Sequence, residues 1–233
     1  MMMQTPRLVT DEADFFQDVI PVRGARVVEL GCGKAAFARS LLLRGIARSV
    51  DAFEVDALQH AANLAAPPVA GLRFGRAGAE AIPLPGDSCD VAVMLKSLHH
   101  VPMDLQGGAL AQIARVLVPG GWLYVSEPVY AGDFNDIVKL FHDEGEVRAA
   151  AYAALRRAAD AGVLRWEREI VFDTPLHFRD FDDFVDRIVR VTHSDIELAP
   201  PVAAEVRRRF EHFQRPDGAH FVRQMRINLL RAA

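Results

Sequence analysis

The segment from Val27 to Ala35, V-V-E-L-G-C-G-K-A, limits the possible folds of this chain more than any other. It opens with an apolar run interrupted only by Glu29, as in an inner strand of a parallel sheet. Gly31 and Gly33 then permit a sharp turn and a close approach of the backbone to a ligand, because neither has a Cβ atom. Beyond Ala35, apolar residues recur every three or four positions, which predicts a helix. A strand, a glycine turn and a helix N-terminus together form a ligand cradle.

The carboxylate of Glu29 narrows the choice of ligand. A glycine turn after a strand also opens dinucleotide sites, but the third glycine position is Ala35 here. A diphosphate is repelled by a neighbouring carboxylate, whereas an ammonium group is attracted to it. S-adenosylmethionine carries an α-ammonium, an α-carboxylate and a sulfonium. Glu29 suits the ammonium, and the helix N-terminus suits the carboxylate.

A second acidic position follows in Glu54, at the end of the next predicted strand, residues 49–56. It lies 23 residues after Gly31. A carboxylate about 20 residues past a glycine turn is placed to accept both hydroxyls of a ribose. Alternatively, Glu54 and Asp56 are only solvated charges at a strand end. Asp56 is also predicted to cap a helix over residues 57–64.

The same alternation continues along the chain. We expect an apolar strand from Asp90, a loop from Lys96 to Val101, a helix over 107–117, a turn at 119–121 and a strand over 122–127. Such alternation implies a parallel sheet with helices on both faces. Ligands of these sheets bind beyond the carboxyl ends of the strands, where all of the loops named above are expected to lie.

With these segments the chain resembles the class I S-adenosylmethionine-dependent methyltransferases of the small-molecule, methyltransferase type 11-like group. The resemblance covers roughly residues 25–130 and rests on four motifs in order: E-L-G-C-G-x-A, F-E-V-D, G-A-E-A-I-P-L-P-x-x-x-C-D-V with S-L-H-H-V, and R-V-L-V-P-G-G-W-L. It implies an S-adenosylmethionine site in which the methionine part is surrounded by Glu29, Gly31, Cys32, Gly33 and Ala35. Glu54 would hold the ribose. Val55 would pack on the adenine, Ala79 and Glu80 would meet the adenine edge, and Leu95 and Lys96 would line the sulfonium side.

Two positions depart from the family pattern. Ala35 replaces the third glycine, and Gly78 stands where an aspartate is often found before the Ala-Glu pair. A carboxylate for the adenine must therefore come from Glu80, or the backbone must take its place. Neither departure removes the carboxylates of Glu29 and Glu54.

The resemblance also implies the fold. We expect an α/β, Rossmann-like, seven-stranded and mostly parallel sheet with helices on both faces. Residues 166–172 and 221–230 are assigned to its last two strands, the final one antiparallel between its neighbours. We expect a single methyltransferase domain over 1–233 with a cofactor-binding core at 25–127. Helical segments at 128–165 and 179–213 would cover the acceptor site, including a cap between the fifth and sixth strands.

Methyl transfer from a sulfonium is an in-line displacement, so the enzyme mainly positions the reactants and excludes water. A hydroxyl or amine acceptor can also need a base. The candidate bases are His99, His100, Glu127, Tyr130 and His142. Each also has a structural interpretation, such as a hydrogen-bonded turn, a strand end or a solvated helix end. The sequence therefore assigns no catalytic residue.

Composition restricts the partners and the compartment. The chain has 27 Lys and Arg against 31 Asp and Glu, a formal charge of −4, which does not favour nucleic acid. Cys32 and Cys89 are expected to be free thiols of a cytoplasmic protein. We see no metal-binding spacing, signal peptide or membrane-spanning run. The predicted partner is a small-molecule acceptor, and the predicted assembly is a monomer or homodimer.

Other functions stay open at this stage. One is an S-adenosylmethionine-binding protein without methyl transfer, acting as a pseudoenzyme or regulator. Another is a nicotinamide-dependent oxidoreductase, which Glu29 and the missing glycine disfavour. An RNA methyltransferase is disfavoured by the acidic composition. The acceptor and its reacting atom (O, N, C or S) are not encoded in a recognisable motif.

Overall fold

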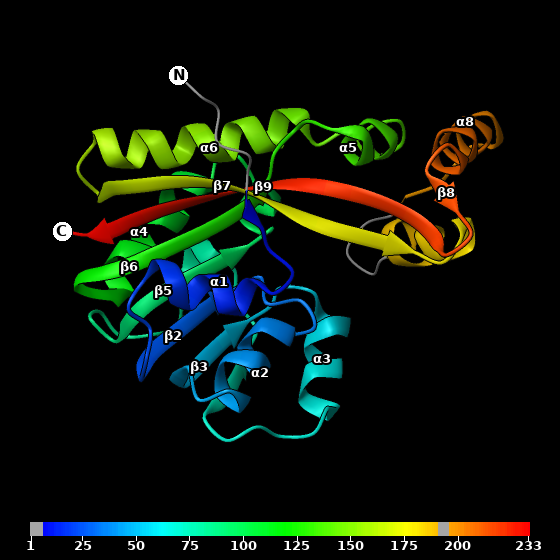
Figure 1. The fold of residues 1–233 in the computed structure, drawn as a ribbon. Helices are drawn as coiled ribbons and strands as arrows, with labels where there is room; N and C mark the ends of the chain where they lie inside the picture. The colour runs from blue at the N-terminus through cyan, green and yellow to red at the C-terminus, as the bar shows by residue number, and fades with distance from the viewer. Residues whose placement is uncertain (1–6, 191–195) are drawn as a thin grey trace. The chain divides into compact units, whose positions relative to one another are not determined.

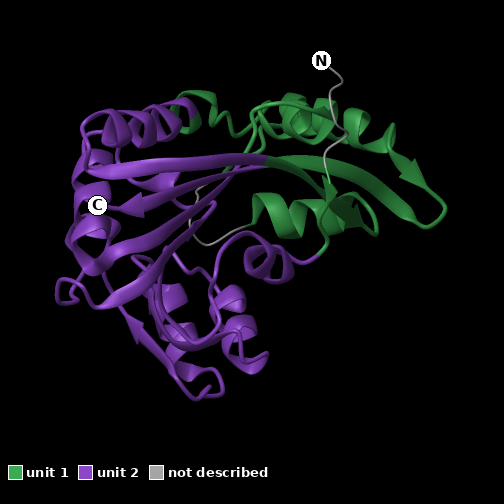
Figure 2. Cartoon of the chain, turned by 60° about the vertical axis from the view of Figure 1, so that its left-hand side comes forward, with its two compact units in different colours: residues 1–10, 128–148, 171–225 green, residues 11–127, 149–170, 226–233 purple. Residues whose placement is uncertain are grey.

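The computed structural model describes residues 7–190 and 196–233 (Figure 1). The chain divides into two compact units, each assembled from three separate segments (Figure 2). Unit 1 comprises residues 1–10, 128–148 and 171–225, and unit 2 comprises residues 11–127, 149–170 and 226–233. The predicted cofactor-binding core, residues 25–127, lies entirely in unit 2.

The strands of the described residues are β1 (Arg7–Leu8), β2 (Ala25–Leu30), β3 (Ala47–Phe53), β4 (Leu72–Gly75), β5 (Cys89–Leu95), β6 (Leu117–Pro128), β7 (Leu164–Phe178), β8 (Gln214–Arg215) and β9 (Gly218–Ala232). The helices are α1 (Glu12–Val19), α2 (Ala36–Leu43), α3 (Ala57–Ala65), α4 (Gln106–Val116), α5 (Asp133–Val138), α6 (Gly145–Asp160), α7 (Phe181–Phe184) and α8 (Pro200–Glu211), with short helical turns η1 (Ala79–Ala81), η2 (Leu98–His100) and η3 (Val185–Val189).

The sheet of unit 2 has the order β7-β9-β6-β5-β2-β3-β4. Parallel pairs join β2 to β3, β2 to β5, β3 to β4 and β5 to β6. Figure 1 shows β9 running opposite to its two neighbours. The chain builds outward from β2 to β4, then returns to the other side of β2 with β5. The strand order therefore reverses between β2 and β5, and the crevice outside their carboxyl ends is where such sheets bind ligands.

Helices cover both faces of this sheet, as the alternation predicts. Alternate residues of the inner strands, such as Val28, Met94 and Val125, are buried in one cluster with α4 and α6. The intervening residues face the other way, where the ring of Tyr124 lies 5.0 Å from that of Phe16 in α1. The predicted α/β architecture is confirmed.

Unit 1 has its own aromatic core. Phe134, Phe178, Phe184, Phe210 and Phe221 are buried together by α5, α7, α8 and the adjoining parts of β7 and β9. Two short strands complete the unit: β1 pairs in parallel with β7, and β8 pairs antiparallel with β9. The described residues thus contain nine strands in place of the expected seven, because two-residue pairings lack the apolar periodicity that marks longer strands.

Several boundaries differ from expectation. Asp11 caps α1, where the sequence also offers Thr10 as a cap, and accepts hydrogen bonds from the N–H groups of Ala13 (2.8 Å) and Asp14 (3.4 Å). The strand predicted over 166–172 extends over 164–178, and the helix expected from Arg179 is the single turn α7 followed by the π-helical η3. Part of the expected segment 179–213, with His193, lies outside the described residues. Among the helices described, none has the length and apolar character needed to cross a membrane.

Candidate cofactor site

The turn after β2 is fixed by its neighbour β3. The N–H groups of Gly31 and Cys32 both donate to the carbonyl of Phe53, at 2.9 and 3.0 Å. Gly31, Gly33 and Ala35 have φ angles of +70°, +51° and +53°. This left-handed conformation costs a residue with a Cβ about 1–2 kcal/mol. This conformation favours glycine at all three positions, and Ala35 adopts it at that cost in strain.

The two glycines serve different purposes. A Cβ added to Gly31 would lie 2.6 Å from the Cβ of Ser97, so Gly31 lets the loop after β5 pack onto the turn. A Cβ added to Gly33 would meet no heavy atom of the described residues within 4 Å. The open side of Gly33 is a direction from which a ligand can approach the backbone. The turn thus leaves room for a ligand at Gly33, and the binding of the predicted cofactor there stays a prediction.

The carboxylate of Glu54 is hydrogen-bonded to the glycine turn. Its side chain is buried, and Oε2 accepts the N–H of Gly33 at 2.8 Å. Oε1 accepts the N–H groups of Val55 (2.8 Å) and Asp56 (3.0 Å). An ionised carboxylate offers about four acceptor positions. Backbone N–H groups take three of these positions, so one remains on Oε2 for a ribose hydroxyl.

Glu29, at the end of β2, contacts the first turn of the helix α2 that follows the glycine turn. It is 2% exposed, and its Oε2 accepts the N–H of Ala38 at 3.1 Å. Ala35 occupies the N-cap of α2 and has no side-chain acceptor, so Glu29 satisfies an N-terminal N–H of the helix. Burial raises the pKa of Glu29 to about 8, against the opposing effect of the Ala38 hydrogen bond and the Lys96 charge. A ligand cation beside Glu29 would favour its ionised form.

Asn63, a buried residue of α3, contacts the glycine turn. The sequence analysis did not identify it as a site residue. Its Nδ2 donates to the carbonyl of Gly33 at 2.7 Å and approaches the Sγ of Cys32 at 3.7 Å. Burial raises the pKa of the Cys32 thiol, so this cysteine is neutral and packs as an apolar group. The available signal was a polar residue within the apolar run A-A-N-L-A.

The predicted adenine side combines an exposed and a buried apolar residue. Val55 is 60% exposed, whereas Ala79 is buried. The carboxylate of Glu80 folds back over Gly78, so that a Cβ added at Gly78 would collide with both of its oxygens. Glu80 thus fills the space of the side chain that Gly78 lacks. Whether Glu80 or the backbone recognises the adenine stays a prediction.

The loop after β5 brings Lys96 to the same edge. Lys96 follows Leu95, has φ +54°, and its N–H donates to Ser126 at 2.7 Å. Its Nζ lies 4.0 Å from the Oε2 of Glu12, whose Oε1 also accepts the hydroxyl of Tyr124 at 3.3 Å. The sequence did not assign Glu12 of α1 to the site. Its charge offsets that of Lys96 on the side predicted for a sulfonium.

His99 and Glu127 form a buried pair at this edge. Nδ1 of His99 is hydrogen-bonded to Oε2 of Glu127, with the two side chains 3% and 6% exposed. Oε1 of Glu127 accepts the N–H groups of Leu98 (2.9 Å) and His99 (3.4 Å). One carboxylate therefore holds both the η2 turn and the imidazole.

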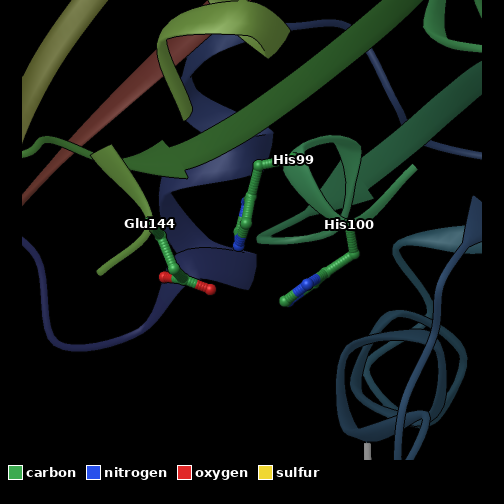
Figure 3. A group of neighbouring side chains, drawn as sticks. All are labelled: His99, His100 and Glu144. Atoms are coloured by element: carbon green, nitrogen blue, oxygen red, sulfur yellow. The ribbon is translucent and has the colours of Figure 1, made fainter. Parts of the chain in front are cut away.

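The neighbouring His100 is exposed. Its ring centroid lies 4.1 Å from that of His99, and the planes are inclined by 42°. Figure 3 shows the two rings extending from η2. Of the two histidines, only His99 is paired with Glu127 in the hydrogen bonds described above.

The remaining candidate bases, Tyr130 and His142, belong to unit 1. The hydroxyl of Tyr130 donates to Asp143 at 2.8 Å, and this hydrogen bond raises the pKa of Tyr130. A raised pKa makes a phenol a poorer base at neutral pH. His142 lies 3.0 Å from Oε1 of Glu144, which also holds Arg148. Both side chains thus have structural partners within their own unit.

Unit 2 also contains a cavity of about 500 Å³ that is not lined by residues of the glycine turn. Gly120, Leu164 and Arg165 are among its lining residues. These residues stand at the amino end of β6 and β7, opposite the edge that carries Gly31 and Ser97. It does not belong to the predicted cofactor site.

Comparison with known proteins places this core in a family. Residues 28–125 match the family described as a methyltransferase domain. These 98 of the 233 residues are therefore similar to a methyltransferase domain. The matched residues run from β2 to β6 and include Gly31, Gly33 and Glu54, so the family assignment and the glycine-turn geometry refer to the same part of the fold.

Relatives and solved structures agree with the assignment. An uncharacterized methyltransferase of Mycobacterium ulcerans is 32% identical over 143 residues, 60% of this chain and 54% of the relative. An O-methyltransferase of Aspergillus nomiae is 35% identical over 130 residues, 52% of this chain and 56% of the relative. The chain spans about half the length of these relatives. A Bacillus halodurans protein assigned as a methyltransferase has the same fold, with a TM-score of 0.64, 15% identity and coverage of 95% and 98%.

Proposed function

We propose that this protein binds S-adenosylmethionine at the carboxyl edge of β2, β3 and β5 and transfers its methyl group to a small-molecule acceptor. The observation that carries the proposal is the open side of Gly33, in a turn whose N–H groups are held by the buried carboxylate of Glu54 and which leads into a helix whose first turn is held by the buried carboxylate of Glu29. It lies where the strand order reverses, which is the usual ligand crevice of such sheets.

The proposed roles follow the chemistry of each group. Glu29 faces the α-ammonium, and Gly31, Cys32, Gly33 and Ala35 form the turn around the methionine part. Glu54 accepts a ribose hydroxyl, and Val55, Ala79 and Glu80 surround the adenine. Leu95 and Lys96 line the sulfonium side.

The bound molecule would supply a methyl group on a positively charged sulfur. The protein's own contribution is to hold the acceptor in line with that methyl group and to exclude water. The turn suits this task because Phe53, Glu54 and Asn63 fix its backbone from three sides. A fixed site loses little conformational freedom on binding.

The acceptor class is inferred from the charge of the chain and from one relative. The net charge of −4 provides no general attraction for nucleic acid. The fungal relative named as an O-methyltransferase makes hydroxyl compounds the first acceptors to test. Because the chain spans about half of its curated relatives, their activities are not transferred as a whole.

Calorimetric titration tests the cofactor. S-adenosylmethionine and S-adenosylhomocysteine should bind with micromolar affinity, and NADH, as a control, should not bind. A mass-spectrometric screen of hydroxyl, amine and thiol metabolites for products heavier by one methyl group then tests transfer. Absence of binding by both sulfur compounds would refute the proposal. Binding without any methylated product would favour a regulatory or pseudoenzyme role.

A further inference from the structure

We propose that Glu12 of α1 is a specificity-determining residue of the cofactor site, whose negative charge favours S-adenosylmethionine over its demethylated product, S-adenosylhomocysteine. This inference rests on the proposed function, since it concerns the same site. It adds a residue of α1 to the carboxylates that stand at the strand ends, and it gives the neighbouring Lys96 the opposite effect.

The carboxylate of Glu12 is held by two partners. Its Oε1 accepts the hydroxyl of Tyr124 at 3.3 Å, and its Oε2 lies 4.0 Å from Nζ of Lys96. The side chain of Glu12 is 19% exposed, and Tyr124 is fully buried in β6. A carboxylate anchored by a buried tyrosine keeps a defined position, and a mostly covered charge is screened less by salt than a charge on the open surface.

The tyrosine that anchors Glu12 lies in the same row of the sheet as Glu29. Glu29 pairs with Val93, and Val93 pairs with Tyr124, so the row crosses β2, β5 and β6. Paired residues of neighbouring strands point to the same face of a sheet, so Glu29 and Tyr124 share a face. The pKa of Glu29, which burial raises to about 8, is lowered by the charge of Lys96 and raised by that of Glu12. Both charges therefore act at the group proposed to face the α-ammonium.

The neighbours of Glu12 do not by themselves call for a charge at this position. A buried tyrosine hydroxyl needs an acceptor, but a neutral amide oxygen would serve it as well as a carboxylate. The side chain of Lys96 is 40% exposed, so water can solvate its ammonium group. With Glu29 and Glu54, Glu12 gives this edge of the sheet three carboxylates beside the ammonium group of Lys96. An excess of negative charge suits a cationic ligand.

The substrate and product forms of the cofactor differ in charge at one atom. S-adenosylmethionine carries its methyl group on a positively charged sulfur, whereas the sulfur of S-adenosylhomocysteine is neutral. Contacts to the adenine, the ribose and the amino-acid part change both affinities together, but a charge near the sulfur changes their ratio. Glu12 should therefore favour the substrate form and Lys96 the product form. Because methyl transfer removes the charge from sulfur, Glu12 also promotes exchange of the product for new substrate.

Calorimetric titration of the full chain with each of the two compounds measures this ratio. Glu12→Gln keeps an acceptor for Tyr124 and removes the charge. Its affinity for S-adenosylmethionine should fall about tenfold, the size of a charge–charge attraction across several ångströms of partly covered protein. Its affinity for S-adenosylhomocysteine should stay within about threefold of wild type. Lys96→Gln should shift the ratio in the opposite direction, and this partly exposed position provides a test that does not depend on how Glu12→Gln folds.

Asp14→Asn is the matched control for Glu12→Gln. It removes one negative charge from the same helix, but Asp14 is exposed and is paired with Arg44, which follows α2. Its ratio of affinities should equal that of the wild type. An unchanged ratio in Glu12→Gln or in Lys96→Gln would overturn the proposal. An equal shift in Asp14→Asn would also overturn it, because the effect would then belong to the net charge of the protein. Failure of the wild type to bind both compounds would instead refute the proposed function.

Discussion

The carboxylate of Glu54 accepts the backbone N–H of Gly33 at 2.8 Å and so joins two positions that are 21 residues apart in the sequence. The residue predicted to hold the ribose therefore also holds the turn. Its position is held by hydrogen bonds from the backbone N–H groups of Gly33, Val55 and Asp56. Such preorganisation reduces the entropy lost when a ligand binds. It also couples the cofactor site to the stability of the fold.

The first prediction separates these two roles of Glu54. Glu54→Ala removes the acceptor of three backbone N–H groups, so the free energy of unfolding should fall by about 2 kcal/mol. Affinity for S-adenosylmethionine should fall at least tenfold, because hydrogen bonds to an ionised group contribute about 1.5–3 kcal/mol each. Chemical denaturation and calorimetry measure the two effects.

Asp56→Ala is the matched control for Glu54→Ala. Asp56 caps α3 by accepting from Leu58 and Gln59, so its loss should cost about 1 kcal/mol of stability. Affinity should stay within about threefold of wild type. If both variants lose affinity in proportion to stability, the ribose assignment of Glu54 is wrong and the effect is structural.

The second prediction concerns the open side of Gly33. Gly33→Ala should strain the backbone at φ +51° by about 1 kcal/mol and project a methyl group into the predicted ligand space. Gly24→Ala imposes similar strain at φ +74°, also with no described atom within 4 Å of the new Cβ. The two melting temperatures should shift alike, whereas only Gly33→Ala should weaken S-adenosylmethionine binding, by tenfold or more. Equal affinities would place the ligand elsewhere.

The third prediction tests Glu80 as the substitute for a missing aspartate. Glu80→Ala should lower the affinity for S-adenosylmethionine, and adding Gly78→Asp should restore it, because the new side chain enters the space that the Glu80 carboxylate occupied. Gly78 has a φ of −84°, so a residue with a Cβ fits its backbone without strain. Gly78→Asp alone should displace Glu80 by repulsion. Failure of the double variant to recover affinity would mean that the adenine is recognised by the backbone.

Much of the cofactor edge could be predicted from the sequence because its determinants are local. The apolar runs, the glycines and the strand-end carboxylates each occupy short segments, and a parallel sheet brings strand ends to one edge regardless of detail. The positive φ of Gly31 and Gly33 agrees with their predicted turn. The capping of α3 by Asp56 was also predicted and is confirmed.

The missed features depend on contacts between distant segments. Asn63 reaches Gly33 across 30 residues, and Glu12 reaches Tyr124 across 112. Neither pairing leaves a local pattern. The tie between His99 and Glu127 likewise joins two motifs that the sequence presents separately, as a loop and a strand end. Sequence reasoning identified both residues as candidate bases, but only the fold joins them as a pair.

The fourth prediction follows from the protonation of Glu29. Its pKa of about 8 means that Glu29 is largely protonated at pH 7 without a ligand. If the α-ammonium of S-adenosylmethionine binds beside it, the ionised form is favoured, so binding should release close to one proton. Calorimetry at pH 7 in buffers of different ionisation enthalpy measures this number. Glu29→Gln should release none; an equal release in the variant would assign the proton to another group.

The last prediction concerns the stability of the ligand-free protein. Glu29 titrates near pH 4.5 when unfolded and near pH 8 when folded, so between these values the native state binds more protons than the unfolded state. The free energy of unfolding should therefore fall as pH rises from 5 to 8, by up to about 4 kcal/mol from this group, because each unit of pKa difference corresponds to about 1.4 kcal/mol. Glu29→Gln keeps an acceptor for Ala38 and remains uncharged, so its stability should lack this contribution and exceed that of the wild type at pH 8. Urea denaturation of both proteins at pH 5, 6.5 and 8 isolates Glu29 from every other titrating group through the difference between the two curves. A constant difference across this range would show that Glu29 is ionised in the folded protein and that Lys96 outweighs the effect of burial.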